Sequence, residues 1–291
     1  MLSIVIPAHN EQAVIGRCLR ALLDGAEPGE LEIIVACNGC ADRTAEAARR
    51  FGHPVRVIEI EQASKTAALN AGDAVASGFP RFYVDADVVI GLDAIRRIAD
   101  ALEQGRLLAA TPELRMDLRE ASWPVRAFYS VWMALPYNNH GGVVGTGVYA
   151  LSREGRSRFE AFPEIIADDG FVRFTYALHE RAGVPGAVSH VEPPRNLRSL
   201  IQIKTRSRLG NYELRRRFPA QRYRERRSLR VILKTLAARP SLWACLPVYL
   251  AVNVMARWRA ARQLTFRKRH VWERDETSRI GRHHAILENS R

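Results

Sequence analysis

Short apolar runs alternate with amphipathic segments through the first half of the chain. Residues 2–7 (LSIVIP) are apolar, rich in β-branched side chains and end at a proline, which is typical of a buried parallel strand. Residues 13–23 then carry apolar positions three and four apart, which predicts a helix packed on that strand. The alternation recurs with strands at 31–37, 54–61 and 81–84 and helices at 42–50, 64–77 and 94–104. The pattern predicts a Rossmann-like, mostly parallel α/β sheet flanked by helices, with ligands beyond the carboxyl ends of its strands.

The periodicity is weaker in the second half of the chain. Residues 107–112 predict one further strand, and residues 122–135 are rich in aromatic side chains. Residues 141–151 indicate a glycine-rich loop that enters a strand, and residues 164–181 an acidic loop followed by a helix. From residue 195 onward the pattern predicts a basic and mostly helical region.

Charge divides the chain into two unequal parts. Residues 1–194 carry 19 basic and 25 acidic side chains, whereas residues 195–291 carry 25 basic and six acidic ones. The first part has a net charge of −6 and the second of +19, which together give the overall +13. A basic third of this kind predicts contact with phosphates or with an anionic membrane face.

The four cysteines are too few and too scattered for a disulfide framework. Cys37 and Cys40 form a lone C-x-x-C pair without the second pair or the histidines that zinc would need. We expect a buried strand end that runs into a turn there. The first residues form a predicted strand with no basic segment before it, so no secretory signal is predicted. We therefore expect the protein to be located in the cytoplasm.

Residues 240–256 form an uncharged window that is flanked by an arginine on each side. Its 17 residues are at the short limit for a membrane-spanning helix, and Pro247 and Asn253 lie inside it. An interfacial or re-entrant segment and a helix packed on the domain are the alternatives. The basic flanks and the aromatic residues Trp243, Tyr249 and Trp258 favour the interfacial interpretation.

Two carboxylates, Asp85 and Asp87, follow the strand at 81–84. Like charges this close repel unless a cation neutralises them, and hard divalent cations prefer oxygen ligands. The pair therefore predicts Mg²⁺ or Mn²⁺ together with a nucleotide diphosphate. In the alternative structural interpretation, one aspartate caps the next helix and the other is solvated.

Polar side chains also follow the other strands of the predicted sheet. His9, Asn10 and Glu11 come after the first strand, Asn38 ends the second, and Lys65 opens the helix that follows the third. Because the carboxyl ends of parallel strands meet at one edge, these groups would line a site for a nucleoside diphosphate. Alternatively each has a local role, as a loop residue, a turn, a helix cap or a surface charge.

At these positions the chain resembles family 2 glycosyltransferases of the GT-A fold. SIVIPAHNE is similar to the opening strand of that family, IIVACNGCADRT to its second strand, SKTAALNAG to its lysine-bearing helix and FYVDADVVI to its D-x-D strand. The resemblance continues through GGVVGTGVYALSREGRSRF to an acidic pair, Asp168 and Asp169, and covers about residues 1–210.

The resemblance implies a role for each matching position. Asp87 would be the direct ligand of Mn²⁺ or Mg²⁺, and Asp85 would contact the ribose or a metal-bound water. His9 takes the place of a tyrosine that is frequent in the family, Asn38 would face the base, and Lys65 would lie near base or ribose. The full set expected around the nucleotide-sugar is Pro7, Ala8, His9, Glu11, Asn38, Lys65, Asp85, Ala86 and Arg206.

Asp169 would be the general base. Inverting glycosyl transfer needs one carboxylate that takes a proton from the acceptor hydroxyl while the diphosphate departs, and it needs no covalent enzyme intermediate. In the alternative structural interpretation, the Asp168–Asp169 pair caps the helix predicted over residues 171–182. The two interpretations are compatible, with Asp168 as the cap and Asp169 as the base.

The chain departs from the family pattern near residue 202. Processive members carry a Q-x-x-R-W-like segment, and QIKTRSRLGN lacks the tryptophan, so a polymerising synthase is not expected. Lys204, Arg206 and Arg208 are all candidates to hold the diphosphate. His190 is predicted to complete the metal shell, with a structural or acceptor-side role as the alternative.

Together these features predict an inverting, metal-dependent glycosyltransferase that acts on an acceptor hydroxyl, with a lipid-linked or cell-envelope glycan as acceptor. We expect a catalytic domain over residues 1–210, in which residues 1–112 bind the nucleotide and 113–210 the acceptor. Residues 211–291 would dock on the anionic cytoplasmic face of the membrane. A non-catalytic protein that binds nucleotide-sugars or nucleic acid on the same sheet is the alternative, although nucleic acid is not expected as a partner.

Overall fold

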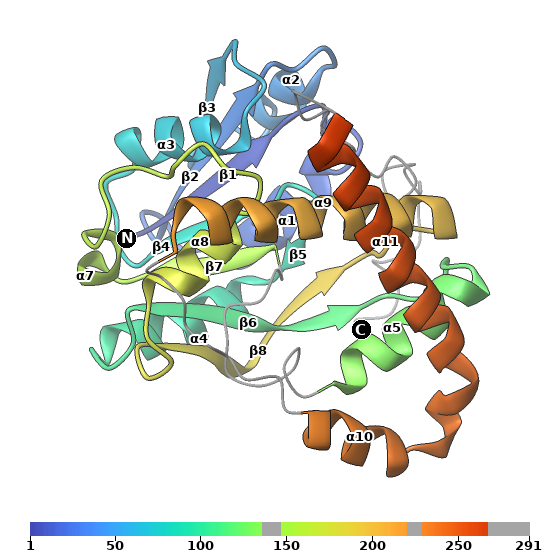
Figure 1. Ribbon diagram of the computed structural model, residues 1–291. Helices are drawn as coiled ribbons and strands as arrows, with labels where there is room; N and C mark the ends of the chain where they lie inside the picture. Colours follow the sequence, from blue (N-terminus) through green and yellow to red (C-terminus); the bar gives the residue numbers. More distant parts are fainter. Residues whose placement is uncertain (136–146, 220–228, 267–291) are drawn as a thin grey trace.

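The computed structural model describes residues 1–135, 147–219 and 229–266 and shows a sheet with helices on both faces (Figure 1). The eight strands lie in the order β3-β2-β1-β4-β7-β6-β8-β5. They are β1 (Leu2–Ala8), β2 (Leu31–Asn38), β3 (Val55–Ile60), β4 (Arg81–Val84), β5 (Val89–Ile90), β6 (Ala109–Met116), β7 (Val148–Leu151) and β8 (Arg181–Val191).

Short helices follow the first strands as the alternation predicts, and longer ones occupy the C-terminal third. They are α1 (Ile15–Leu23), α2 (Thr44–Arg49), α3 (Lys65–Val75), α4 (Leu92–Glu103), α5 (Trp123–Ala134), α7 (Arg153–Arg156), α8 (Asp168–Thr175), α9 (Leu197–Arg217), α10 (Leu229–Ala237), the 3₁₀ helix η1 (Pro240–Cys245) and α11 (Leu246–Phe266).

Strand pairing sets the edge at which polar groups meet. β1 pairs in parallel with β2 and with β4, and β2 pairs in parallel with β3. β7 is antiparallel to both β4 and β6. The carboxyl ends of β1, β2 and β4 therefore lie side by side, where a ligand site is expected in a sheet of this type.

Alternating side chains of β1 divide the core between the two faces of the sheet. Ile4 and Ile6 contact the apolar stripes of α1, α2 and α4 on one face. Val5 points to the other face, where it joins a cluster with Leu69 of α3, Phe171 of α8 and Leu214 of α9. Burial on both faces explains why β1 is apolar at every position except Ser3.

Two glycines allow α3 and the loop before it to approach the sheet. A Cβ atom at Gly72 would lie 2.4 Å from Cγ1 of Val5, so only glycine lets α3 pack this closely on β1. Gly39 has a φ of +55°, and a Cβ atom there would lie 2.9 Å from the Cβ of Ala63. The turn after β2 therefore brings the start of α3 next to the end of β2.

A buried carboxylate joins α3, β4 and α7. Asp73 pairs with Arg81 at 2.7 Å and with Arg156 at 2.6 Å, and it accepts a hydrogen bond from the Tyr83 hydroxyl at 2.6 Å. Burial would raise the pKa of Asp73, but hydrogen bonds from Arg156, Tyr83 and Arg81 outweigh it and lower that pKa. The network anchors the helix that begins with Lys65.

The C-terminal helices pack on α5 and α9. Val252 of α11 joins a buried cluster with Phe128 of α5 and Leu200 of α9, and Tyr249 stacks on Phe128 with ring centroids 5.1 Å apart. The uncharged window at 240–256 is divided between η1 and α11. Within the described ranges, none of the helices is apolar over a stretch that could cross a bilayer.

The mostly parallel sheet is confirmed, but its far edge differs from the prediction. β8 was not predicted as a strand. The helix expected at 171–182 forms as α8 with other bounds, because it begins at Asp168 and ends at Thr175, and Arg181 already begins β8. β8 contains Pro185 and shows no regular alternation, so its pairing with β6 and β5 decides its conformation. The predicted boundary at residue 210 falls inside α9 and stays a prediction.

Replacing Asp73 with asparagine is expected to lower the free energy of unfolding at neutral pH by about 3 kcal/mol, because Arg81 and Arg156 would keep buried charges without a carboxylate. The contribution of Asp73 is complete above its unfolded pKa of about 3.9 and disappears as the pH falls through the lower folded-state value. Urea unfolding at neutral and acidic pH measures both effects.

Asp100→Asn, on the exposed side of α4, serves as the control and should leave stability unchanged. A difference between wild type and Asp73→Asn that stays constant down to the most acidic condition would contradict the assignment.

Candidate active site

A cavity of about 140 Å³ opens at the carboxyl ends of β1, β2 and β4. Its walls are formed by the loop after β1, the end of β2, the start of α3, the segment after β4 and one side chain of α9. The residues that line it are Pro7, His9, Glu11, Asn38, Ala63, Lys65, Asp85, Ala86, Asp87 and Arg206. All but Ala63 were singled out in the sequence.

Backbone contacts between β1 and β2 shape one wall of this cavity. The ring of His9 is hydrogen-bonded through Nδ1 to the carbonyl oxygen of Asn38. Because a carbonyl only accepts, Nδ1 carries the proton. The amide of Asn38 donates to the carbonyl oxygen of Ala8 at 2.9 Å, and Ala8 itself is fully buried beneath the wall rather than lining it.

Lys65 forms ion pairs with carboxylates from two distant segments. Its Nζ lies 2.7 Å from Oδ1 of Asp85 and 3.1 Å from Oδ1 of Asp168. Burial would lower the pKa of Lys65, but the charges of Asp168 and Asp85 outweigh it and raise that pKa. The ammonium group therefore links the aspartates after β4 to the beginning of α8.

Asp168 does not cap α8, so the capping interpretation is wrong for this residue. It is the first residue of the helix, is 4% exposed, and accepts a hydrogen bond from the Tyr149 hydroxyl at 3.3 Å. Burial raises the pKa of Asp168, while the nearby charge of Lys65 opposes the shift. The carboxylate points toward Lys65 and Tyr149 because a buried carboxylate without a cation and a hydrogen-bond donor would cost more free energy than a helix end without a cap.

Asp169 is half-buried beside this ion-paired group. Its Oδ1 accepts a hydrogen bond from the backbone N–H of Gly170 at 2.7 Å, and its charge contributes to the raised pKa of Lys65. Asp169 does not itself line the cavity. Its role as the general base stays a prediction. The structure places Asp169 directly after Asp168, which forms an ion pair with Lys65.

Two residues that the sequence did not reveal hold the Asp87 segment. Arg17 of α1 donates to the carbonyl oxygen of Asp87 at 3.2 Å and forms an ion pair with Glu192, directly after β8. Arg17 lies beside an apolar helical stripe and Glu192 beyond an unpredicted strand. No local pattern indicates that the two meet.

His190 lies outside the cavity. It is an exposed residue of β8, opposite Val89 of β5 in the strand register. In the part of the chain that the structure describes, no three His, Cys, Asp or Glu side chains gather as a ready-made metal site. Its role in a metal shell stays a prediction.

The three cations of α9 have different surroundings. Arg206 lines the cavity, whereas Arg208 donates to the side chain of Asn253 at 2.7 Å. Lys204 lies over three aromatic rings of α5 at 4.9–5.1 Å from their centroids. Burial, and secondarily the charge of Arg208, lowers the pKa of Lys204 to about 8. Of the three candidates for a diphosphate contact, Arg206 is the one at the cavity.

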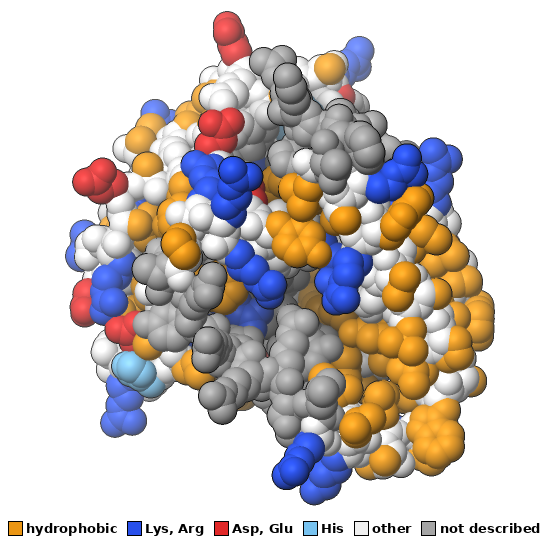
Figure 2. Space-filling view, in the orientation of Figure 1, with side chains coloured by type: hydrophobic (Ala, Val, Ile, Leu, Met, Phe, Trp, Pro, Cys, Tyr) orange, Lys and Arg blue, Asp and Glu red, His pale blue; other side chains and the backbone are white. Residues whose placement is uncertain are grey.

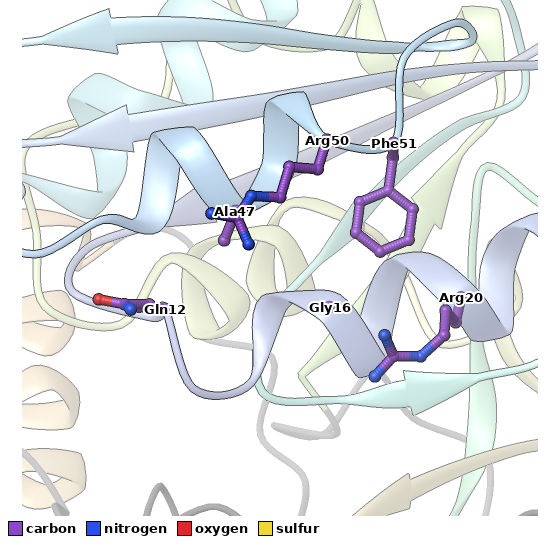
Figure 3. Close-up of a pocket in the computed structure, with 6 residues that line it drawn as sticks. All are labelled: Gln12, Gly16, Arg20, Ala47, Arg50 and Phe51. Carbon is purple, nitrogen blue, oxygen red and sulfur yellow. The ribbon is translucent and has the colours of Figure 1, made fainter.

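A second cavity, of about 320 Å³, lies between α1 and α2 (Figure 3). It is lined by Gln12, Gly16, Arg20, Ala47, Arg50 and Phe51. It contains no carboxylate and none of the predicted site residues, so the strand-end cavity is the candidate active site.

The C-x-x-C pair has the expected structural role. Cys37 is buried near the end of β2, where that strand pairs with β1. The Cys40 sulfur contacts the backbone of Asn10 and Ala8 at 3.4–3.5 Å. Both are free thiols.

Residues 3–149 match the model described as Glycosyl transferase family 2, which is about half of the chain. The chain belongs to glycosyl transferase family 2. The prediction made from its strand-end motifs is thereby confirmed.

Similar proteins agree with this assignment. Glycosyltransferase AglE of Haloferax volcanii is 35% identical over 91 residues, which cover 30% of this chain and 30% of that protein. The mannosyltransferase PcManGT of Pyrobaculum calidifontis, solved with GDP-Man and Mn²⁺, superposes with a TM-score of 0.65 at 20% identity, over 92% of this chain and 88% of that one. Glucosyl-3-phosphoglycerate synthase of Mycobacterium tuberculosis, solved with Mn²⁺ and UDP, has a TM-score of 0.53 at 22% identity, over 75% and 79% of the two chains. These superpositions confirm the predicted GT-A fold.

A double-mutant cycle tests the pairing between Lys65 and Asp168. Lys65→Ala is expected to lower the free energy of unfolding by about 3 kcal/mol, because Asp168 would stay buried without its cation. In the double variant with Asp168→Asn, the combined loss should be smaller than the sum of the single losses by about 1 kcal/mol or more. Urea unfolding of the four proteins gives this coupling energy.

Lys65→Ala combined with Asp100→Asn is the matched control and should be additive, since Asp100 is exposed on α4. Additive losses in the Lys65–Asp168 cycle as well would show that the two groups do not interact.

Proposed function

We propose that this chain transfers a sugar, with inversion, from a nucleotide diphosphate-sugar to an acceptor hydroxyl. The observation that carries the proposal is the convergence of carboxylates at one cavity. Asp85 and Asp87 line it, and Lys65 ties Asp85 to Asp168, the neighbour of Asp169. A donor-binding group and a candidate base therefore belong to one connected site.

The nucleoside would lie against the wall made by the ends of β1 and β2. His9, held by the Asn38 carbonyl, offers a flat ring for stacking on a base, and Pro7 and Glu11 lie on the same cavity. Asn38 supplies an amide, and Lys65 the cation near the ribose.

A divalent cation suits the carboxylates after β4. Asp85 and Asp87 supply hard oxygen ligands at the same cavity, which fits Mn²⁺ or Mg²⁺. Asp87 would bind the ion directly, with His190 as a further candidate ligand and the Arg17 hydrogen bond holding the Asp87 backbone in place. When bound, the ion would offset negative charge on the departing diphosphate. PcManGT, which has the same fold, was solved with Mn²⁺.

Asp169 would accept the proton of the acceptor hydroxyl. The oxygen of that hydroxyl then bonds to the anomeric carbon as the bond from this carbon to the diphosphate breaks, and the proton remains on the carboxylate. Arg206, at the cavity, would stabilise the charge of the leaving diphosphate. Lys65 and Tyr149 would hold Asp168, and through it the first turn of α8, in position.

The acceptor proposed here is a lipid-linked or cell-envelope glycan, reached from the cytoplasmic face of the membrane. The net charge of +19 over residues 195–291 supports contact with anionic headgroups.

Asp169→Asn is expected to lower the rate of sugar transfer by about 10²–10⁴-fold, the usual contribution of a general base. Nucleotide affinity should stay nearly unchanged, because Asp169 does not line the donor cavity. Donor turnover with a panel of nucleotide-sugars and membrane extracts as acceptor measures the first effect, and nucleotide titration the second. Normal turnover by this variant would show that another group is the base; Asp100→Asn serves as the unaffected control.

Asp87→Asn is expected to remove the effect of Mn²⁺ on nucleotide binding. A thermal-shift screen of UDP, GDP and dTDP, with and without Mn²⁺, identifies the preferred base. A nucleotide present at a thousand times its dissociation constant should stabilise the wild type by about 4 kcal/mol. In Asp87→Asn, Mn²⁺ should add nothing to this value. An unchanged Mn²⁺ response would remove Asp87 from the metal site.

A further inference from the structure

Large apolar side chains are exposed in a row on η1 and α11. Trp243 is 59% exposed, Val254 67% and Trp258 54%, and Leu250 and Met255 are exposed beside them. We call these five residues the η1–α11 face. Figure 2 shows hydrophobic side chains gathered on the side of the molecule where α11 and α10 lie in Figure 1.

The opposite side of α11 already has its packing partners. Val252, Ala256 and Ala260 are at most 2% exposed, and Val252 belongs to the buried cluster with α5 and α9. Leu250, Val254 and Trp258 are four residues apart and so lie along one side of the helix, away from that cluster. Single exposed apolar residues are ordinary, but a continuous row of this size marks a contact surface.

The charged side chains of η1 and α11 are all of one sign. Arg257, Arg259 and Arg262 follow Val254 along α11, and Arg262 lies over the ring of Trp258 at 4.8 Å from its centroid. No aspartate or glutamate occurs between residues 229 and 266. Because a symmetric contact between two copies would bring these arginines together without acidic partners, self-association is disfavoured.

We propose that the η1–α11 face docks the protein on a bilayer of anionic phospholipid, with α11 lying in the plane of the membrane. Its apolar side chains would enter the boundary between headgroups and acyl chains, to a depth of about 5–10 Å, while the arginines contact headgroup phosphates. Tryptophan suits this boundary, because its ring is apolar and its N–H is polar.

Helix α9 connects this face to the candidate active site. Arg206 of α9 lines the donor cavity, and two residues later Arg208 donates to Asn253 of α11. Docking would therefore hold the cavity at a constant position relative to the bilayer. An acceptor hydroxyl carried on a lipid would meet the donor there; this last step rests on the proposed function, whereas the docking itself does not.

Vesicle flotation of the full chain tests the docking. The protein should float with vesicles made of equal parts phosphatidylcholine and phosphatidylglycerol and much less with phosphatidylcholine alone. The triple variant Leu250→Ser, Val254→Ser and Trp258→Ser should lose at least about tenfold in affinity, because its exposed apolar area is removed. Arg257→Gln and Arg262→Gln should each lose about fivefold on anionic vesicles.

Leu178→Ser is the matched control, since Leu178 is 55% exposed and lies outside the η1–α11 face. All variants should keep the wild-type melting temperature, because the changed side chains are exposed. The flotation experiment uses no sugar donor. Its result and the result of the transfer assay are therefore independent, and failure of the docking proposal can be told apart from failure of the proposed function.

Three results would overturn the proposal. The wild type could fail to float with anionic vesicles, or the triple variant could float as well as the wild type. Sedimentation without vesicles could also show a wild-type dimer that the triple variant abolishes, which would make the face a contact between copies of this chain.

Discussion

One half-buried ammonium group holds the candidate site together. Lys65 begins α3, Asp85 follows β4 and Asp168 begins α8, so three segments far apart in the sequence meet at a single charge. Asp168 is buried, so its carboxylate would be costly without the charge of Lys65, and this constrains the three segments to one arrangement. Gly72 and the Asp73 network reinforce it, because they fix the helix that carries Lys65 against β1 and β4.

Helix α9 has a comparable role on the C-terminal side. Three cations within five residues have three different environments: Lys204 lies on the aromatic rings of α5, Arg206 at the strand-end cavity and Arg208 against α11. One helix thus packs on the domain, lines the site and supports the surface proposed to dock on lipid. In a membrane-docked transferase such a helix would set the distance from the bilayer to the donor.

The first half of the fold was predictable because β1, β2 and β4 are buried on both faces. β1, β2 and β4 are mostly apolar, and the polar residues that follow them had to gather at one edge of a parallel sheet. β8 was not predictable, since its glycines and Pro185 hide the strand pattern and its conformation comes from pairing with β6. The capping role expected of Asp168 failed for a related reason: local spacing suggested a helix end, whereas burial beside Lys65 and Tyr149 decided where its carboxylate points.

The sequence by itself determined the family and the succession, along the chain, of the strands that carry the motifs. It also determined the edge of the sheet at which His9, Asn38 and Asp87 would meet. Periodicity and motif order are local properties, and they survive without knowledge of distant contacts. Only the tertiary structure decided which charges pair, that Arg206 rather than Lys204 or Arg208 lies at the cavity, and that Arg17 holds the Asp87 backbone. Those outcomes depend on helices packing across the sheet, and the energy of a buried charge is set by its neighbours in space rather than in sequence.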